Sequence, residues 1–352
     1  MAFVMYPLAR ELFRVADIPR RLIPATIALG IFTFTMTALP GSPQVQNIIP
    51  GQFFGTGSFA GPGIGLLGGA LIFGFGLLWL EYRRTVLIRK GETFDSPESA
   101  RVIGGSSDDG AGNQVTTLEP ANRLIPFLPL LTVFAVNFAC TLLIFPALDW
   151  SYLEDEKFGG VGFDERAGLW AVLLGIIAGV LLLLALNARN FATLWTGCVD
   201  GAKRSMLPIF STASEVGYGA VVASVAAFAV VRDSVFGLGV GALWTSVFSV
   251  SITAGLTGSS SGGMTIALNA LGDDLRTMAE QEGISMEAMH RLTAMAAGGL
   301  DTLPHSGAVV TLLIVCGLTH RQSYKDLGVV TLVVPVIVVV ALVGLVSVVG
   351  AF

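Results

Sequence analysis

Two stretches, 33-TFTMTALPGSPQVQN-47 and 297-AGGLDTLPHSGAVVTLLIVC-316, decide how this chain folds. Each places a Leu-Pro-x-Ser tetrapeptide inside an apolar run that is long enough to enter a lipid bilayer. A proline within a helix lacks a backbone N–H and frees a carbonyl one turn earlier. Hydrocarbon cannot satisfy such groups, so the break is tolerated only inside protein or beside a water-filled cavity. The two stretches therefore predict broken membrane helices around a polar interior.

The composition is that of an all-α polytopic membrane protein. The 352 residues are 53% hydrophobic and 13% charged, with a mean hydropathy of +0.75, whereas soluble proteins carry about 25% charged residues. No basic stripe indicates nucleic-acid binding, and no nucleophile–base pair or metal-ligand cluster indicates an enzyme, so no cofactor is expected. Three cysteines lie too far apart for a zinc site or a disulfide framework: Cys140, Cys198 and Cys316.

The apolar runs divide the chain into two halves. Residues 1–81 contain the exit arm of a hairpin, at residues 1–16, followed by a broken helix over 22–57 and a span over 62–81. Residues 82–123 are rich in Gly, Ser, Asp and Arg and bury little apolar surface. They predict a flexible cytoplasmic linker between the halves.

The second half, residues 124–352, contains more elements than the first. Three spans precede an apolar arm, a Gly/Ser tip and a short apolar arm that is too short to cross a bilayer. This pair predicts a re-entrant hairpin over 237–272 with its tip at 258–263. A broken helix over 292–318 and a final span over 327–349 follow.

The distribution of Lys and Arg orients the chain. Cytoplasmic loops carry an excess of basic residues, which assigns the acidic segment 149–165 and the stretches 232–236 and 273–291 to the outside. His290 and His320 are expected at the membrane interface. Four basic clusters are assigned to the cytoplasmic side: Arg20/Arg21, Arg83/Arg84/Arg89/Lys90, Arg189/Lys203/Arg204 and Arg321/Lys325.

The two halves have the same final order of elements, a broken helix and then a span. They therefore predict an inverted-repeat transporter fold, because transporter repeats place broken helices at corresponding positions around a substrate site. The first half lacks the spans and the full hairpin of the second. We expect the first repeat to be incomplete in this sequence, with its hairpin lying before Met1.

Three motifs carry a resemblance to a known family. The segments 37-TALPGSPQVQN-47, 255-GLTGSSSGG-263 and 301-DTLPHSGAVVTLLIVCGLTHRQSY-324 resemble the gluconate permease (GntP-type) family of the ion transporter superfamily. The resemblance covers essentially the whole chain. It implies a multi-pass permease of the bacterial inner membrane that takes up small hydroxy-carboxylates such as gluconate or 3-hydroxybutyrate, usually with protons. A homodimer would fit the superfamily.

Polar residues at the breaks and at the hairpin tip are the candidate substrate ligands. The helix half that begins near Ser306 offers free N–H groups and a positive dipole end, which suit a carboxylate. Glycine-flanked serines allow the backbone to approach a ligand closely, while side-chain amides suit hydroxyl groups. The candidate set is Ser42, Gln46, Asn47, Ser259, Ser260, Ser261, Thr302, His305 and Ser306.

Titratable residues inside apolar segments are rare and are candidates for carrying a coupling proton. They are Glu215, Asp301 and His305. Alternatives remain for each motif: a surface turn for the serine cluster, an interfacial proline turn for the breaks, a purely structural hydrogen-bonding role for Glu215 and His305, and a helix-terminal position near the interface for Asp301. Sodium coupling and a non-transporting remnant are alternative functions. Against sodium, the serine-rich tip lacks the Ser-Asn-Thr triplet that sodium-coupled members of the superfamily use.

Overall fold

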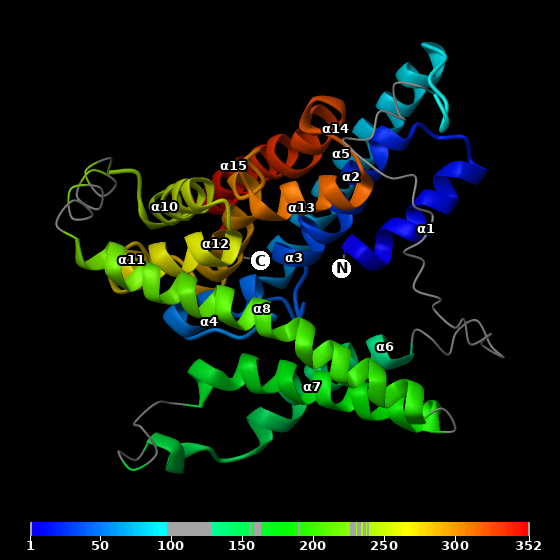
Figure 1. The fold of residues 1–352 in the computed structure, drawn as a ribbon. Coiled ribbons are helices and arrows are strands. Elements are labelled where there is room, and N and C mark those ends of the chain that lie inside the picture. Colours follow the sequence, from blue (N-terminus) through cyan, green and yellow to red (C-terminus); the bar gives the residue numbers. More distant parts are fainter. Residues whose placement is uncertain are drawn as a thin grey trace. The chain divides into compact units, whose positions relative to one another are not determined.

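The computed structural model describes residues 2–96, 128–154, 163–188, 191–225 and 239–350, with isolated positions 157, 230, 234 and 237. The chain forms two compact units. Unit 1 comprises Met1–Arg101 and Ile209–Phe352, and unit 2 comprises Val102–Pro208. Throughout the described ranges the regular elements are helices (Figure 1). The predicted all-α class is confirmed.

Four of the described helices are long and apolar enough to cross a membrane, which confirms the polytopic prediction. They are Pro62–Arg89, Leu128–Ala147, Ala167–Leu186 and His320–Val349. Shorter apolar helices at Ala242–Thr257 and Gly307–Cys316 accompany them. Because these two are too short to span alone, they are the elements that a hairpin and a broken helix require.

The first broken helix consists of short pieces. After the amphipathic α1 (Ala2–Val15), the chain forms α2 (Ile23–Ile31) and the single turn α3 (Phe34–Thr37), which ends just before the Leu39-Pro40 break. A short 3-10 turn, η2 (Val45–Asn47), follows the break, and the next α-helix is α4 (Ile49–Phe54). The α-helical piece that follows the break is thus six residues long.

The helix α5 (Pro62–Arg89) continues two turns beyond the predicted end of its span at residue 81. Its start is set by Gly61, which has φ +54, and by a proline in the first turn. Leu80, Arg83 and Leu87 lie on one helix face and are buried, so packing sustains the helix through residues predicted as linker. The predicted linker residues 97–123 lie outside the described residues.

The predicted re-entrant element is a helical hairpin of α10 (Ala242–Thr257) and α11 (Ser260–Gln281). Gly258 turns the chain at φ +64, and the side chain of Ser259 caps α11 by accepting from the Gly262 N–H at 3.2 Å. The second arm runs nine residues past the predicted end at 272. Its buried stripe of Leu271, Leu275 and Ala279 continues at four-residue spacing through the charged segment.

The second broken helix occupies the centre of unit 1. Its first piece, α12 (Met286–Leu300), contacts α3, α4, α10, α11 and α15, and its residues 288–299 are all buried. The break follows, and α13 (Gly307–Cys316) completes the element. Figure 1 shows α12 beside α10 and α11, with α13 close to α2.

The segment 273–291, predicted as an outer charged stretch, is instead largely helical, and α12 begins at the cap residue Ser285. His290, which was predicted at the membrane interface, is fully buried within unit 1, and its depth in the membrane stays a prediction. Sequence alone placed the start of this helix too late, because its first turns carry charged residues that pack inward.

The final span also begins earlier than the predicted residue 327. A capping box at Thr319 and Gln322 starts α14 (His320–Gly328). The helix then passes through a π-helical turn, η9 (Val329–Val333), into α15 (Val334–Val349). The whole element is 30 residues long.

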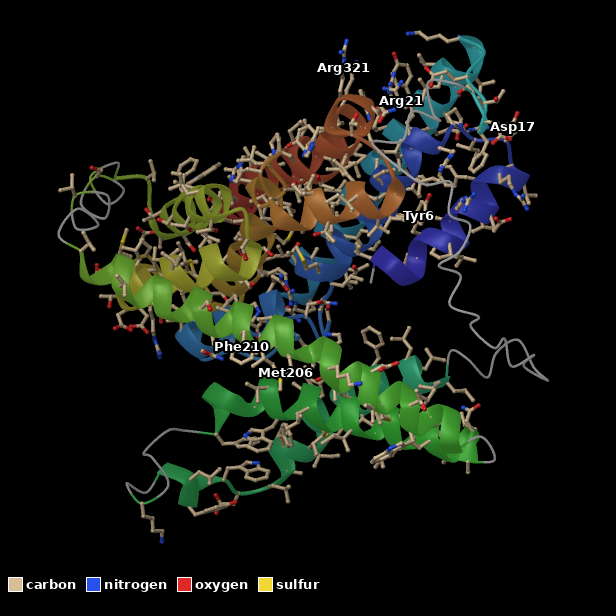
Figure 2. All side chains as sticks on the ribbon, viewed as in Figure 1. Tyr6, Asp17, Arg21, Met206, Phe210 and Arg321 are labelled. Carbon is tan, nitrogen blue, oxygen red and sulfur yellow. The ribbon has the colours of Figure 1, made fainter. Side chains whose placement is uncertain are left out.

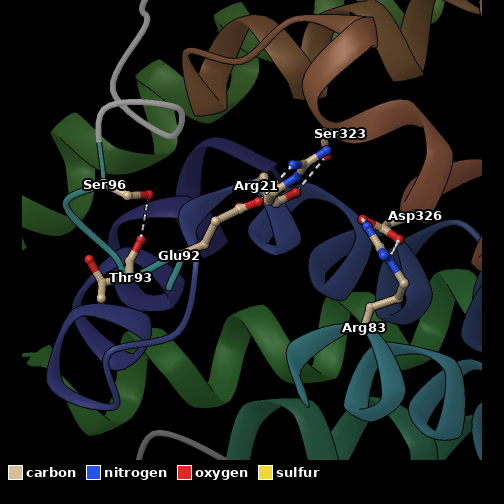
Figure 3. A network of polar contacts seen from close by, with 7 residues as sticks. All are labelled: Arg21, Arg83, Glu92, Thr93, Ser96, Ser323 and Asp326. Carbon is tan, nitrogen blue, oxygen red and sulfur yellow. Dashed lines mark hydrogen bonds and ion pairs between the residues drawn. The ribbon is translucent and has the colours of Figure 1, made fainter. Parts of the chain in front are cut away.

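An ion-pair network joins three basic segments at one end of unit 1 (Figure 3). Arg83 Nε and Nη2 donate to the two carboxylate oxygens of Asp326 at 2.5 and 3.3 Å, and both residues are buried. Nearby, Arg21 pairs with Glu92 at 3.4 Å, while the Ser323 hydroxyl donates to the Arg21 carbonyl.

Three of the four basic clusters therefore share one end of unit 1, as the orientation requires. Figure 2 shows Arg21 and Arg321 at this end, together with Asp17. Asp17 accepts from the Phe94 N–H at 3.0 Å, so the chain after α5 is attached here as well. A common side for these clusters is what the cytoplasmic assignment needs, and the assignment itself stays a prediction.

Unit 2 is built on a pair of spans. The helix α6 (Leu128–Ala139) continues through a π turn, η4 (Cys140–Ile144), and packs against α7 (Asp164–Leu186). Gly175 and Gly179, one turn apart on α7, face the backbone carbonyls of α6, as expected for small residues at a membrane helix interface. The long helix α8 (Phe191–Ser224) crosses the boundary between the two units.

Gly263→Ala is expected to destabilise the hairpin. An added Cβ would collide with the backbone of Ala254 on the facing arm, which cannot rotate away as a side chain would. Overpacking of this kind costs about 1–3 kcal/mol or more. The matched control is Gly74→Ala, where no atom lies within 4 Å of the new Cβ. Thermal unfolding in detergent should fall only for Gly263→Ala, and equal melting temperatures would contradict this packing.

Asp326→Asn is expected to lower the free energy of unfolding by about 3–5 kcal/mol, because it leaves the buried Arg83 charge without its partner. The double variant Arg83→Met, Asp326→Leu removes both charges and should recover most of that loss. Denaturation of the purified protein measures both effects. A double variant no more stable than Asp326→Asn would show that the pair does not act as a unit.

Candidate functional site

The two halves of the chain meet at the hairpin tip. Gln46, from the first break, donates through Nε2 to the hydroxyl of Ser260 at 2.8 Å. Ser260 is 7% exposed, and its hydroxyl lies close enough to the carboxyl group of Asp301 to act on it electrostatically. The structure thus brings together three predicted site residues from three separate segments, which we call the cross-half cluster.

Asp301 occupies an unusual position for a carboxyl group. It is the C-terminal cap residue of α12 and begins the second break, yet only 7% of its surface is exposed. Its Oδ1 atom is buried and has no hydrogen-bond partner among the described residues. A buried acceptor without a partner costs free energy, so this position is suited to a group that gains and loses a proton or contacts a ligand.

The second break is attached to the other side of the hairpin tip. His305 Nε2 hydrogen-bonds the Gly255 carbonyl at 2.9 Å, and the Ser306 hydroxyl donates to the Gly258 carbonyl at 2.9 Å. Gly258 lies so close that an added Cβ would be 3.2 Å from both residues. The predicted grouping of His305 and Ser306 with the tip is therefore present.

Ser306 is the N-cap residue of α13, but its side chain does not cap the helix. The hydroxyl instead donates to the Gly258 carbonyl of the hairpin, while the Val310 N–H donates to the Ser306 carbonyl. Gly307 and Ala308, which form the first turn of α13, are exposed. The positive end of this helix is consequently open to an anion.

Two carbonyl groups within the second break find partners on α14. His320 Nε2 hydrogen-bonds the Pro304 carbonyl at 2.8 Å, and the Tyr324 hydroxyl donates to the Thr302 carbonyl at 3.1 Å. The hydroxyl of Thr302 is used within its own turn, on the Gly299 carbonyl. Thr302 therefore shapes the break, and its backbone and side chain are both engaged.

Two predicted ligands in the first break are engaged in holding that segment together. The Ser42 hydroxyl donates to the Thr35 carbonyl at 2.8 Å. Asn47 is fully buried, and its Nδ2 donates to the carbonyls of Ser42 and Ser58 at 2.9 and 2.8 Å. In this conformation both side chains hold the first break together, whereas the neighbouring Gln46 reaches out of the break to Ser260.

The remaining predicted residues lie apart from these contacts. Ser259 caps α11, and Ser261 lies in the first turn of that helix. Glu215 lies on α8, where its side chain is outside the described residues. A cavity of about 710 Å³ opens at the ends of α10, α12 and α15, lined by Trp244, Glu282 and Glu287 among others, and none of the predicted ligands lines it.

Sequence reasoning missed two buried residues at the start of α12. His290 hydrogen-bonds the Thr56 hydroxyl through Nδ1 at 2.7 Å. Arg291 donates to Asn47 Oδ1 and to the carbonyls of Ser58 and Ala60. The cap residue Ser285 is the signal that would have moved the helix start upstream and exposed this pair.

This arrangement defines a class of protein: a multi-pass, all-helical membrane transporter in which two broken helices meet at a hairpin tip. Comparison with known proteins agrees. Over 338 residues the chain is 38% identical to the "Uncharacterized transporter YxjC" of Bacillus subtilis (strain 168), an alignment that covers 95% of this chain and 71% of YxjC. The chain belongs to the same transporter family as YxjC. No family model and no solved structure matches it.

Gly258→Ala is expected to weaken transport more than stability alone explains. The left-handed backbone of Gly258 disfavours a side chain by about 1–2 kcal/mol, and the new Cβ would also press on His305 and Ser306. Gly55→Ala is a matched control, since Gly55 has the same φ of +64 and nothing within 4 Å. The rate of solute uptake by membrane vesicles should fall for Gly258→Ala and persist for Gly55→Ala. Equal losses of uptake in the two variants would contradict a special role for the tip.

Proposed function

We propose that this protein is a proton-coupled symporter for a small hydroxy-carboxylate, of the gluconate permease (GntP-type) family, acting by alternating access in the bacterial plasma membrane. The observation that carries the proposal is the cross-half cluster of Gln46, Ser260 and Asp301. It supports a solute site because it unites a hydrogen-bonding amide, a hydroxyl and a buried carboxyl group at the contact between the halves.

The groups around the tip have the chemistry that a hydroxy acid requires. The first turn of α13 presents N–H groups and a positive dipole end, which favour a carboxylate. Gln46 and Ser260 can each exchange their mutual hydrogen bond for one to a hydroxyl group of the solute. We therefore assign the carboxylate to the α13 end and the hydroxyl groups to the cross-half cluster.

Asp301 is the proposed coupling group. When its carboxyl group is protonated, a negative charge disappears from the neighbourhood of the bound anion. Proton binding and anion binding then favour each other, and this favourable coupling is reciprocal by linkage. Its buried, unpartnered Oδ1 supports Asp301 over His305 for this role, since His305 is exposed and engaged with Gly255.

Alternating access is assigned to the hairpin tip. Beside the electrostatic contact of Ser260 with Asp301, two hydrogen bonds join the hairpin to the second break, from the His305 ring to the Gly255 carbonyl and from the Ser306 hydroxyl to the Gly258 carbonyl. Each is worth only about 0.5–1.5 kcal/mol net. A solute that supplied equivalent hydrogen bonds would offset their loss, which allows the tip to separate from the break on one side of the membrane.

Uptake by proteoliposomes containing the purified protein tests this function. An inward proton gradient should drive accumulation of gluconate or 3-hydroxybutyrate, and a protonophore should abolish it. Accumulation that follows a sodium gradient and ignores the proton gradient would favour sodium coupling, for which the oxygens of Asp301 and Ser260 are also suitable ligands. Absence of uptake for every carboxylate tested would overturn the proposal.

Asp301→Asn is expected to separate binding from coupling. The amide keeps the size of the side chain but cannot release a proton, so proton-driven accumulation should be lost. Exchange of labelled for unlabelled solute across the membrane needs no net proton release and should persist. Asp273→Asn, at an exposed position on α11, is the matched control and should behave as wild type. Proton-driven accumulation by Asp301→Asn would contradict the assignment.

A further inference from the structure

Arg291 is the most deeply buried cation in the described part of unit 1. Its relative exposure is 0%, and four hydrogen bonds hold its guanidinium group. Nε and Nη2 donate to the Ala60 carbonyl at 2.9 and 2.7 Å, Nη2 also donates to the Ser58 carbonyl at 3.1 Å, and Nη1 donates to Asn47 Oδ1 at 2.6 Å. All the acceptors belong to the first half of the chain, whereas Arg291 belongs to the second.

These acceptors are neutral, so the charge of Arg291 is solvated but not cancelled. Among the described residues no carboxylate forms an ion pair with it, in contrast to Arg83, which is paired by both oxygens of Asp326. The acidic group that acts on Arg291 is Glu287, one turn earlier on α12. Glu287 is exposed, and one of its oxygens accepts from the Gly61 N–H.

A buried charge without a charged partner is expensive to maintain. If Arg291 served only to attach α12 to the loop before α5, a neutral hydrogen-bonding group would do so at lower cost. Gly61 and Gly65 provide the space for it, since an added Cβ at either would come within 2.9–3.1 Å of the arginine side chain. The local structure is therefore built around a guanidinium group whose positive charge is left available.

Arg291 lies one residue from the cross-half cluster. It binds Asn47, and the preceding residue, Gln46, contacts Ser260. The path from Arg291 to Ser260 consists of two hydrogen bonds, the Asn47 and Gln46 side chains and one Cα–Cα step of about 3.8 Å, so the guanidinium group lies within about 18 Å of the Ser260 hydroxyl. At that separation and an effective dielectric constant of about 20, one buried charge changes the affinity for a monovalent anion by about fivefold.

We propose that Arg291 is the residue that makes the site selective for anions. It acts without touching the solute: its positive charge, which forms no ion pair among the described residues, attracts an anionic solute whose hydroxyl groups bind the cross-half cluster, while its bond to Asn47 positions Gln46. The inference deepens the proposed function and rests on it. It identifies the ligand class as a hydroxy acid in its anionic form and predicts discrimination against the neutral amide or polyol of the same shape.

The test measures binding of two probes to the purified protein: the hydroxy acid with the highest uptake, gluconate or 3-hydroxybutyrate, and its neutral primary amide. Wild type should bind the anion more tightly than the amide. Arg291→Gln should reduce that ratio about fivefold, whereas Arg291→Lys, which keeps the charge but loses the planar fork, should weaken both probes and retain most of the ratio. Arg276→Gln removes an exposed arginine from α11 and should leave both affinities unchanged.

A second variant keeps the inference testable if Arg291→Gln does not fold. Glu287→Gln preserves an acceptor for the Gly61 N–H but removes the negative charge that acts on Arg291, at an exposed position. It should raise the anion-to-amide ratio by about twofold. An unchanged ratio in Arg291→Gln or in Glu287→Gln would overturn the role of Arg291 alone. Failure of wild type to bind the anion would overturn the proposed function as well.

Discussion

The constraint on which this structure depends is that a backbone polar group inside a membrane must find its partner within the protein. The second break shows how the constraint is met. Carbonyls released around Pro304 are taken by His320 and Tyr324 from the following helix. On the other side, the tip carbonyls of Gly255 and Gly258 are taken by His305 and Ser306. Satisfying broken backbone is what attaches the hairpin, the break and the final span to one another.

The first break meets the same constraint by a different route. Here the carbonyls of Ser42, Ser58 and Ala60 accept hydrogen bonds from two buried polar side chains, Asn47 and Arg291. The two breaks are therefore alike in sequence and unlike in use. The first is held by several hydrogen bonds from a cation and an amide, and the second is held by single hydrogen bonds at an open helix end. Gln46 links the first break to the hairpin tip.

Sequence reasoning recovered the elements that depend on local rules. The helix class, both breaks, and the Gly258 turn follow from hydropathy, proline chemistry and glycine, which act over a few neighbouring residues. The starts of α12 and α14 and the end of α11 were misplaced, because each of these segments mixes exposed charged residues with buried residues whose packing partners lie in other parts of the chain. Arg291 was missed for the same reason: its acceptors are 231–244 residues upstream.

That separation along the chain has a consequence for how the protein is made. An arginine in an inserting helix is costly to the insertion machinery, by about 2.5–3.5 kcal/mol at the helix centre. By the time α12 leaves the ribosome, the loop that carries Asn47, Ser58 and Ala60 has long been synthesised. The hydrogen-bond acceptors are therefore inserted before the guanidinium group enters the bilayer. Biogenesis of this transporter would then proceed as a docking reaction, in which a late, weakly hydrophobic helix is drawn into the membrane by an early segment.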